Sequence, residues 1–317
     1  MPRPSLPLDA LLSRQLHMVT GKGGVGKSTL ACALAVHFMN RGERVLLAQV
    51  NAKDSHSQML GLAGIPDDLH HVSDKLCVVN VSPEQSLRQY AMMHLKFEAV
   101  YKTVFENRLT KAFMRFIPSM AQLNMMGKLW FHAEEREDGR LRFDKVIIDA
   151  PATGHALDLL RVARVVNDVA GRGPMADDTR KMQETLADPE RSALHVVTLA
   201  EEMPANETEE LLAKAEMEKL MPLGLVVVNQ LREQLFDDAT RDWLGAIDVD
   251  GEAAGLVGVA QRRAAREQLE QKYSNRLSED HLQVPRVDFP FIPQAPFSRA
   301  QLDVLAARLT QEREARP

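Results

Sequence analysis

The eight residues from Gly21 to Ser28 read G-K-G-G-V-G-K-S and place four glycines and two lysines ahead of a serine. Glycine allows the tight backbone wrap that turns several N–H groups toward one anion. The lysine before the serine, Lys27, can reach the β- and γ-phosphates of a nucleotide. An apolar run precedes the stretch and helix-compatible sequence follows it. This order of strand, loop and helix predicts a nucleotide phosphate site.

The same pattern assigns the remaining groups of the site. Ser28 offers its hydroxyl to Mg²⁺, and Thr29 can bond the α-phosphate. Asp149 ends the apolar run "VIIDA" and is suited to hold the ion through a water molecule. The backbone N–H groups predicted to converge on the phosphates are those of Gly23, Gly24, Val25 and Gly26.

The stretch contains one lysine more than a phosphate loop needs, Lys22. A residue at the start of the wrap turns its backbone inward, so its side chain tends to point out of its own site. A long cation there can reach phosphates held by a second molecule. An ordinary solvated lysine is the alternative, and the residue types alone leave both interpretations open.

Apolar runs of strand length recur along the chain, each followed by polar, helix-compatible sequence. Most runs are continuous, as expected of strands covered on both faces, and they alternate with helices. This predicts a mainly parallel, doubly wound α/β sheet. Ligands bind such sheets at the carboxyl ends of the strands, where the phosphate loop lies. The predicted strands are 16–20, 44–50, 76–81, 145–150, 193–200, 223–230 and 284–291.

Two intervals, 84–140 and 166–192, are too long for simple crossovers, and both read as helical. We expect a single domain over residues 1–317, with these inserts forming a helical subdomain on one side of the sheet. The charged segment 260–277 is expected to be a helix with a solvated surface.

Composition narrows the class of protein. The net charge of −5 and the pI near 6.1 give no electrostatic case for nucleic-acid binding, which needs a clustered basic surface. Cys32 and Cys77 are too few for a disulfide scaffold, and neither lies in a C-x-x-C pair. The N-terminus lacks the apolar core of a signal peptide, and no run reaches the roughly 18–20 apolar residues of a membrane span. These features predict a soluble cytoplasmic protein without stable membrane insertion.

Residues 22–28, K-G-G-V-G-K-S, resemble the deviant Walker A signature of one class of P-loop ATPases. That class contains the arsenite-pump, tail-anchored-protein-targeting, septum-placement and partition ATPases. Its first lysine crosses a dimer interface to the partner's nucleotide, which implies the same role for Lys22. The resemblance thus implies a P-loop NTPase fold, ATP and Mg²⁺ as ligands, and a dimer.

A second motif, "DAPATGHALDLLR" at 149–161, resembles switch II of the arsenite-pump and targeting ATPases, and the partition branch does not carry its T-G-H. The chain is thereby identified as a bacterial-type member of the anion-transporting ATPase family. In this resemblance Asp149 belongs to the switch. Thr153 and Gly154 sense the γ-phosphate and pass that state to the helix beginning near His155.

A third match lies in "VVVNQL", 226–231, where Asn229 follows a buried strand. An asparagine amide can pair with the N6 and N7 edge of adenine, and the family uses this residue for the base. The proline-rich stretch 289–298, which includes Pro293, is expected to wall the adenine pocket. The resemblance covers the sheet from about residue 15 to 300, while the helical inserts match only in position and character.

The chain departs from the family at switch I, which typically reads D-P-A-H-x-x-S with its first Asp positioning the attacking water. Asn51 stands where that Asp belongs. An amide can hold a water but cannot act as a carboxylate base, so slow hydrolysis is expected. Asp54, three residues on, is the candidate substitute. The C-x-x-C pair of the eukaryotic zinc clip is absent from the sequence, so no zinc is expected.

Two functions compete on this basis. The first is an ATP-dependent, dimerising switch that handles apolar protein segments or another protein partner. The second is a regulatory subunit that holds ATP, hydrolyses it poorly, and forms a heterodimer with a paralogous ATPase. Methionines of the 84–140 insert decide how clients would be bound, because they either fill its core or line an apolar surface that accepts varied partners. These are Met92, Met93, Met114, Met120, Met125 and Met126.

Overall fold

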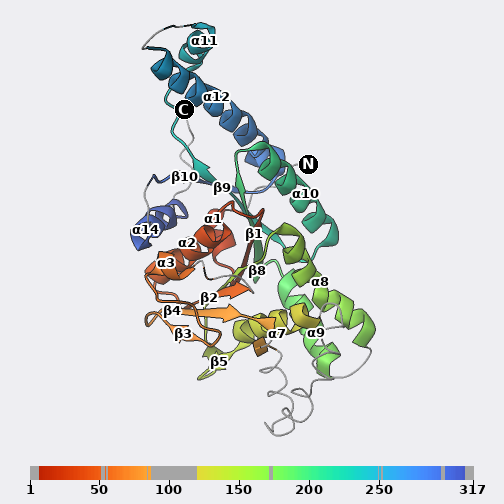
Figure 1. Cartoon of the computed structure of the whole chain (residues 1–317). Helices are drawn as coiled ribbons and strands as arrows, with labels where there is room; N and C mark the ends of the chain where they lie inside the picture. The colour runs from red at the N-terminus through yellow and green to blue at the C-terminus, as the bar shows by residue number, and fades with distance from the viewer. Residues whose placement is uncertain are drawn as a thin grey trace, which may run out of the picture.

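A mainly parallel sheet forms the centre of the molecule, as the apolar runs predict (Figure 1). The computed structural model describes residues 7–50, 54, 56–83, 85–86, 120–170, 174–248, 250, 253–293 and 297–310. The strand order is β10-β9-β8-β1-β7-β2-β4-β3, and among the described strands each pairing in this sheet is parallel except that of β3 with β4. The α/β fold class is therefore confirmed.

Each predicted strand is present to within two residues of its expected bounds. The bounds are β1 Leu16–Gly21, β2 Val45–Val50, β4 Leu76–Val81, β7 Lys145–Asp149, β8 Ser192–Leu199, β9 Leu223–Leu231 and β10 Arg286–Pro290. The short edge strand β3, His70–His71, was not predicted. Its two side chains are exposed and polar, so it lacks the apolar signal that marks the central strands.

Helices cover both faces of the sheet (Figure 1). On one face lie α1 (Leu8–Leu12), α2 (Lys27–Asn40), α3 (His56–Leu60) and α14 (Arg299–Arg308). On the other lie α7 (Met120–Glu134), α8 (Thr153–Ala170), α9 (Pro174–Ala187) and α10 (Glu202–Glu218). This is the doubly wound arrangement that continuous apolar strands require, because both of their faces must be kept from water.

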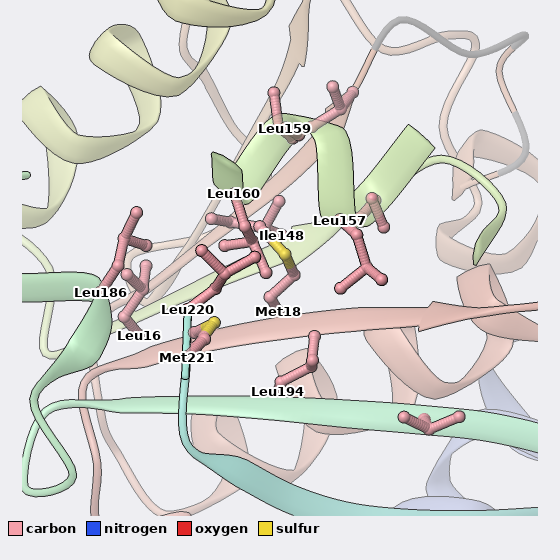
Figure 2. Packing of buried hydrophobic residues seen from close by; sticks show 14 of the residues in the cluster. Leu16, Met18, Ile148, Leu157, Leu159, Leu160, Leu186, Leu194, Leu220 and Met221 are labelled. Carbon is pink, nitrogen blue, oxygen red and sulfur yellow. The ribbon is translucent and has the colours of Figure 1, made fainter. Parts of the chain in front are cut away.

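The core consists of two apolar clusters separated by the sheet. Side chains alternate between them along β2, where Leu46 and Ala48 join one cluster and Val45 and Leu47 join the other. In the cluster beneath α8, side chains of that helix point toward the face of β1 that carries Met18 (Figure 2). The central strands are thus fixed from both sides, which holds their carboxyl ends in a constant position.

The described parts of the two inserts are mostly helical, as predicted, and α7, α8 and α9 pack together. One exception is the hairpin of β5 (Arg136–Glu137) and β6 (Arg140–Leu141), which turns at Asp138 and Gly139, both with positive φ. The Asp-Gly pair is the local hairpin signal that the helical interpretation of 84–140 overlooked.

The structure decides between core and surface for two methionines of the 84–140 insert. Met125 and Met126 of α7 are 5% and 1% exposed, and both belong to the core cluster. Met92, Met93 and Met114 lie outside the described residues, as does the side chain of Met120.

α11 (Asp238–Ala246) and the long α12 (Ala254–Arg276) pack on each other and project from the sheet as an arm (Figure 1). At its base, Arg276 Nη2 donates to Glu209 Oε2 of α10 at 2.6 Å. The helix predicted at 260–277 is present, but its surface is not wholly solvated. Glu267 is 2% exposed and accepts hydrogen bonds from the backbone N–H groups of Leu235 and Phe236.

The short α13 (Glu279–Leu282) completes the described elements. None of the helices in the described ranges is both long and apolar enough to cross a membrane.

Candidate nucleotide-binding site

The phosphate-binding loop, Gly21–Ser28, joins the carboxyl end of β1 to the N-terminus of α2. β7 and β8 flank β1 in parallel, so the loop lies where the carboxyl ends of three strands meet. α2 begins at Lys27 and directs its first N–H groups and its positive dipole end at the loop. The backbone alone therefore favours an anion at this point.

Two glycines of the loop are required by close neighbours. Gly26 caps α2 in the left-handed region with φ 102°, and a Cβ there would clash with the amide of Asn229. Gly21 has φ 148°, and a Cβ there would clash with the backbone carbonyl of Val197 on β8. A Cβ at Gly23 would meet no described atom within 4 Å. The glycines thus serve the packing of the loop on its supporting strands as well as its open surface.

Asn229 ties this loop to β9. Its Nδ2 donates to the carbonyl oxygen of Val25 at 2.8 Å, and its Oδ1 accepts the N–H of Gln230 at 2.9 Å. An amide has two N–H donors and two acceptor lone pairs, so one of each remains after these bonds. Asn229 also lines a small hollow beside the loop. The predicted contact with adenine is compatible with this arrangement and remains a prediction.

Arg232 is a member of this hollow that the sequence did not reveal. Its guanidinium lies 4.5 Å from the ring centroid of Phe291 and pairs with Glu270 at 2.7 Å. Pro293, the predicted pocket wall, is exposed shortly after β10, while residues 294–296 of the same stretch lie outside the described part of the chain. The stacked arginine was missed because its two partners are distant in sequence.

The side chains predicted to hold phosphate and metal lie close together. Ser28 Oγ donates to Asp149 Oδ2 at 2.6 Å. Lys27 Nζ donates to the carbonyl oxygen of Lys22 at 3.0 Å, across the loop. Burial lowers the pKa of Lys27, and the Asp149 carboxylate offsets only part of this effect. Thr29 is half-buried in the first turn of α2.

His56, the first residue of α3, was not predicted as part of the site. Its Nε2 lies 2.8 Å from Asp149 Oδ2, the same oxygen that Ser28 bonds. The histidine is fully buried, and Asp149 is 5% exposed. No motif marks this residue, and the contact joins positions 93 residues apart.

Lys22 also has a partner that the sequence did not suggest. Its Nζ donates to Glu207 Oε1 of α10 at 2.5 Å. Both side chains are about one-third exposed, at 31% and 35%. Within this single chain, the additional lysine is therefore held by a carboxylate rather than left in solvent.

The switch residues are placed as follows. Thr153 begins α8, while Gly154 and His155 lie exposed in its first turn. The side chain of Thr153 lies outside the described part of the structure. The sensing role of these residues stays a prediction.

Switch I is only partly described, because Asn51 lies outside the described residues. Asp54 accepts the backbone N–H groups of Ser57 and Ile65 at 3.0 and 3.1 Å. Burial raises the pKa of Asp54, but hydrogen bonds led by Ser57 outweigh it and the net pKa is lowered. The carboxylate thus anchors the start of α3, a structural use that the sequence did not predict.

The residues present fit a magnesium–nucleotide complex. Asp149 Oδ1 is buried and has no hydrogen-bond partner in the described part of the chain, while the proton of Ser28 is directed at Oδ2. This leaves the lone pairs of Asp149 Oδ1, a hard oxygen donor of the kind that Mg²⁺ prefers. The described residues contain no group of three or more His, Cys, Asp or Glu that could hold a metal, and Mg²⁺ bound with phosphates does not need one.

Sequence comparison relates the chain to known ATPases. Residues 14–173 and 172–245 match the family model described as anion-transporting ATPase. The ATPase BagA of Mycobacterium tuberculosis is 28% identical over 309 residues, covering 88% of this chain and 87% of that protein. The arsenical pump-driving ATPase of Escherichia coli is 30% identical over 238 residues, covering 72% of this chain and 38% of that protein. ATPase GET3 of Komagataella phaffii is 24% identical over 265 residues, covering 69% of this chain and 73% of that protein.

Proposed function

Since the chain belongs to the anion-transporting ATPase family, and so binds and hydrolyses ATP, we propose that it acts as a dimerising switch timed by slow ATP turnover. The observation that carries this proposal is the joining of Ser28 and Asp149 beneath a glycine loop that bears two lysines. Lys22 is the second of these cations, and a phosphate site that acts within one subunit needs only Lys27.

The residues divide the work of nucleotide binding among themselves. Loop N–H groups and Lys27 bind the phosphates, since the ammonium of Lys27 has further N–H donors beyond the one that bonds the carbonyl of Lys22. Ser28 and Asp149 hold Mg²⁺, which neutralises charge that develops on the phosphates. Asn229 orients the base with its remaining donor and acceptor while keeping the loop against β9.

Dimerisation is assigned to Lys22. Its ion pair with Glu207 is partly exposed, and such pairs contribute only about 0–1 kcal/mol. A phosphate from a second subunit can therefore compete for this lysine. The partner is a second copy of the chain, or a paralogous ATPase in the alternative function, where the chain serves as a weakly hydrolysing regulatory subunit.

Slow turnover is attributed to Asn51, which replaces the carboxylate expected at the attacking water. Asp54 is a poor substitute, because both its oxygens already accept backbone hydrogen bonds. A long-lived ATP state suits a switch, since it prolongs any complex that forms while ATP is bound.

We propose that the helical inserts present an apolar surface to a protein partner. Burial of Met125 and Met126 removes them from that surface. Among the described residues of the inserts, Phe131 on α7 is an exposed large apolar side chain, at 38%. Val165 on α8, at 50%, lies one residue before the second insert.

The proposal is tested by comparing two lysine variants. We expect Lys27→Ala to weaken binding of a fluorescent ATP analogue about 30- to 150-fold, which corresponds to the loss of charge-assisted hydrogen bonds worth about 2–3 kcal/mol. Lys22→Ala should retain monomer affinity but lose ATP-dependent association, measured by analytical ultracentrifugation. An equal loss of nucleotide affinity in both variants would exclude the cross-dimer role of Lys22.

A further inference from the structure

The carboxylate of Asp149 is held by two donors on a single oxygen. Ser28 Oγ lies 2.6 Å and His56 Nε2 lies 2.8 Å from Oδ2. An ionised carboxylate only accepts hydrogen bonds, so in this arrangement the imidazole carries a proton on Nε2 and donates it. Both donors therefore pull the same oxygen into one fixed position.

This arrangement leaves the second oxygen of Asp149 for another ligand. Oδ1 is buried and has no partner within the described part of the chain. A buried carboxylate oxygen without a partner is costly, and such atoms call for an explanation such as an ion or water. The magnesium site proposed above supplies that explanation, because it needs one oxygen from this aspartate.

The backbone around His56 is itself fixed. Asp54 accepts the N–H of Ser57, in the first turn of α3, and the N–H of Ile65 beyond its end. α3 also packs against α2, the helix that carries Ser28. The histidine is thus presented to Asp149 by a short helix that Asp54 anchors and that packs on α2.

We propose that His56 is a positioning residue of the magnesium site, which fixes the rotamer of Asp149 and leaves Oδ1 available to the ion. It acts through Asp149 and contacts no phosphate in this assignment. The link also connects α3, which follows the switch I segment, to the aspartate that ends β7. Groups that orient metal ligands in this way typically affect metal affinity about 10- to 100-fold.

This inference rests on the proposed magnesium–nucleotide site, and the experiment separates the two. Binding of a fluorescent, non-hydrolysable ATP analogue is measured in EDTA and over a MgCl₂ titration. The variants are His56→Phe, which keeps an aromatic ring without the donor, and His56→Gln, which places an N–H near the same point. His132→Phe is the matched control, since His132 is also a buried histidine that bonds a carboxylate, Glu135, at 2.9 Å.

We expect His56→Phe to raise the half-maximal Mg²⁺ concentration about ten-fold or more, with affinity in EDTA changed less than about two-fold. His56→Gln should restore most of the Mg²⁺ response, and His132→Phe should leave it unchanged. The inference is overturned if His56→Phe responds to Mg²⁺ like the wild type, or loses affinity equally with and without the ion. If the wild type shows no Mg²⁺ response at all, the proposed site fails and the inference fails with it.

A measurement on the wild type covers the case in which His56→Phe does not fold. NMR spectra of protein labelled with ¹⁵N-histidine report which ring nitrogen carries the proton, and His56→Gln assigns the signal. The expected result is a proton on Nε2 that is retained when Mg²⁺ and the ATP analogue bind. A His56 ring protonated only on Nδ1 would show that it donates nothing to Asp149.

Discussion

Lys22 Nζ and Glu207 Oε1 lie 2.5 Å apart, which joins the phosphate-binding loop to α10 within one chain. The additional lysine is therefore paired with a carboxylate of its own chain, although about one-third of its side chain is exposed. To contact a nucleotide on another subunit it must first exchange one anionic partner for another. If subunits associate in this way, the strength of the ion pair between Lys22 and Glu207 helps to set how readily they do so.

The first prediction concerns Glu207→Gln. Removing the carboxylate frees Lys22 from a partly exposed ion pair worth about 0–1 kcal/mol, so ATP-dependent association should strengthen by up to about five-fold. Sedimentation equilibrium with a non-hydrolysable analogue measures the change. Glu210→Gln, at an exposed carboxylate of the same helix, is the matched control. Weaker association in Glu207→Gln would mean that this carboxylate supports the dimer.

The second prediction is that Asn51→Asp raises kcat. Restoring a carboxylate that positions the attacking water should increase turnover about ten-fold or more, with little change in nucleotide affinity. Steady-state ATP hydrolysis and analogue binding separate the two effects. Asp54→Asn should instead cost stability, about 1 kcal/mol, because an amide has one acceptor oxygen and can keep only one of the two backbone hydrogen bonds, while kcat falls little. A kcat that is unchanged in Asn51→Asp but collapses in Asp54→Asn would reverse these assignments.

A third prediction contrasts two glycines of the same loop. Gly26→Ala forces a Cβ against Asn229 at a positive φ, and should cost about 1–3 kcal/mol and most nucleotide binding. Gly23→Ala meets no described atom within 4 Å, so its effect on unfolding should stay within about 0.5 kcal/mol. Urea unfolding and analogue binding check both variants. If Gly26→Ala lowered the free energy of unfolding no more than Gly23→Ala does, the side chain of Asn229 would have moved away from the new methyl group.

The fourth prediction concerns pH and two buried histidines, His17 on β1 and His195 on β8. Leu225 N–H donates to His195 Nδ1, and His195 Nε2 lies 3.0 Å from His17 Nδ1. His17 Nε2 in turn lies 2.8 Å from the carbonyl oxygen of Arg14. One proton on each Nε2 satisfies the whole chain, so both rings are neutral. Burial, aided by Arg14, lowers the pKa of His195 to about 3.

Folding lowers the pKa of His195, so its contribution to the free energy of unfolding is fully present above the pKa of the unfolded state. That contribution is lost as the pH falls from the unfolded pKa toward the folded pKa. For His195 the loss begins near pH 6.5 and proceeds at about 1.4 kcal/mol per pH unit. The difference in unfolding free energy between about pH 7.5 and about pH 5 should therefore be about 2 kcal/mol smaller in His195→Gln. His281→Gln, at an exposed site, is the control. An unaltered pH dependence in His195→Gln would mean that this ring is not the titrating group.

Much of the fold could be predicted because the strands carry their signal locally. β2 and β7 contain the apolar runs V-L-L-A and V-I-I, which are typical of a sheet covered on both faces. The elements that were missed have weak or contrary local signals. β3 consists of two exposed histidines, and the Asp138–Gly139 turn lies within an interval of helical composition.

The site divides in the same way. Lys27, Ser28 and Asp149 belong to motifs whose spacing encodes their function, and the structure brings them together. Glu207 lies 185 residues from Lys22, and its choice among many surface carboxylates depends on how α10 packs. For Met125 and Met126, the sequence identifies an apolar pair on a helix. It does not show how much of that helix the neighbouring elements cover.

α10 connects two distant features of the molecule through residues only two positions apart. Glu207 holds the loop lysine, while Glu209 bonds Arg276 at the base of the α11–α12 arm. α12 has 23 residues and is about 34 Å long, so a tilt of about 5° at its base would move its far end by about 3 Å. The base of the arm is thus bonded to the same helix that holds Lys22 of the phosphate-binding loop. A displacement of α10 too small to alter the sheet would therefore move α11, at the far end of the arm, by a measurable distance.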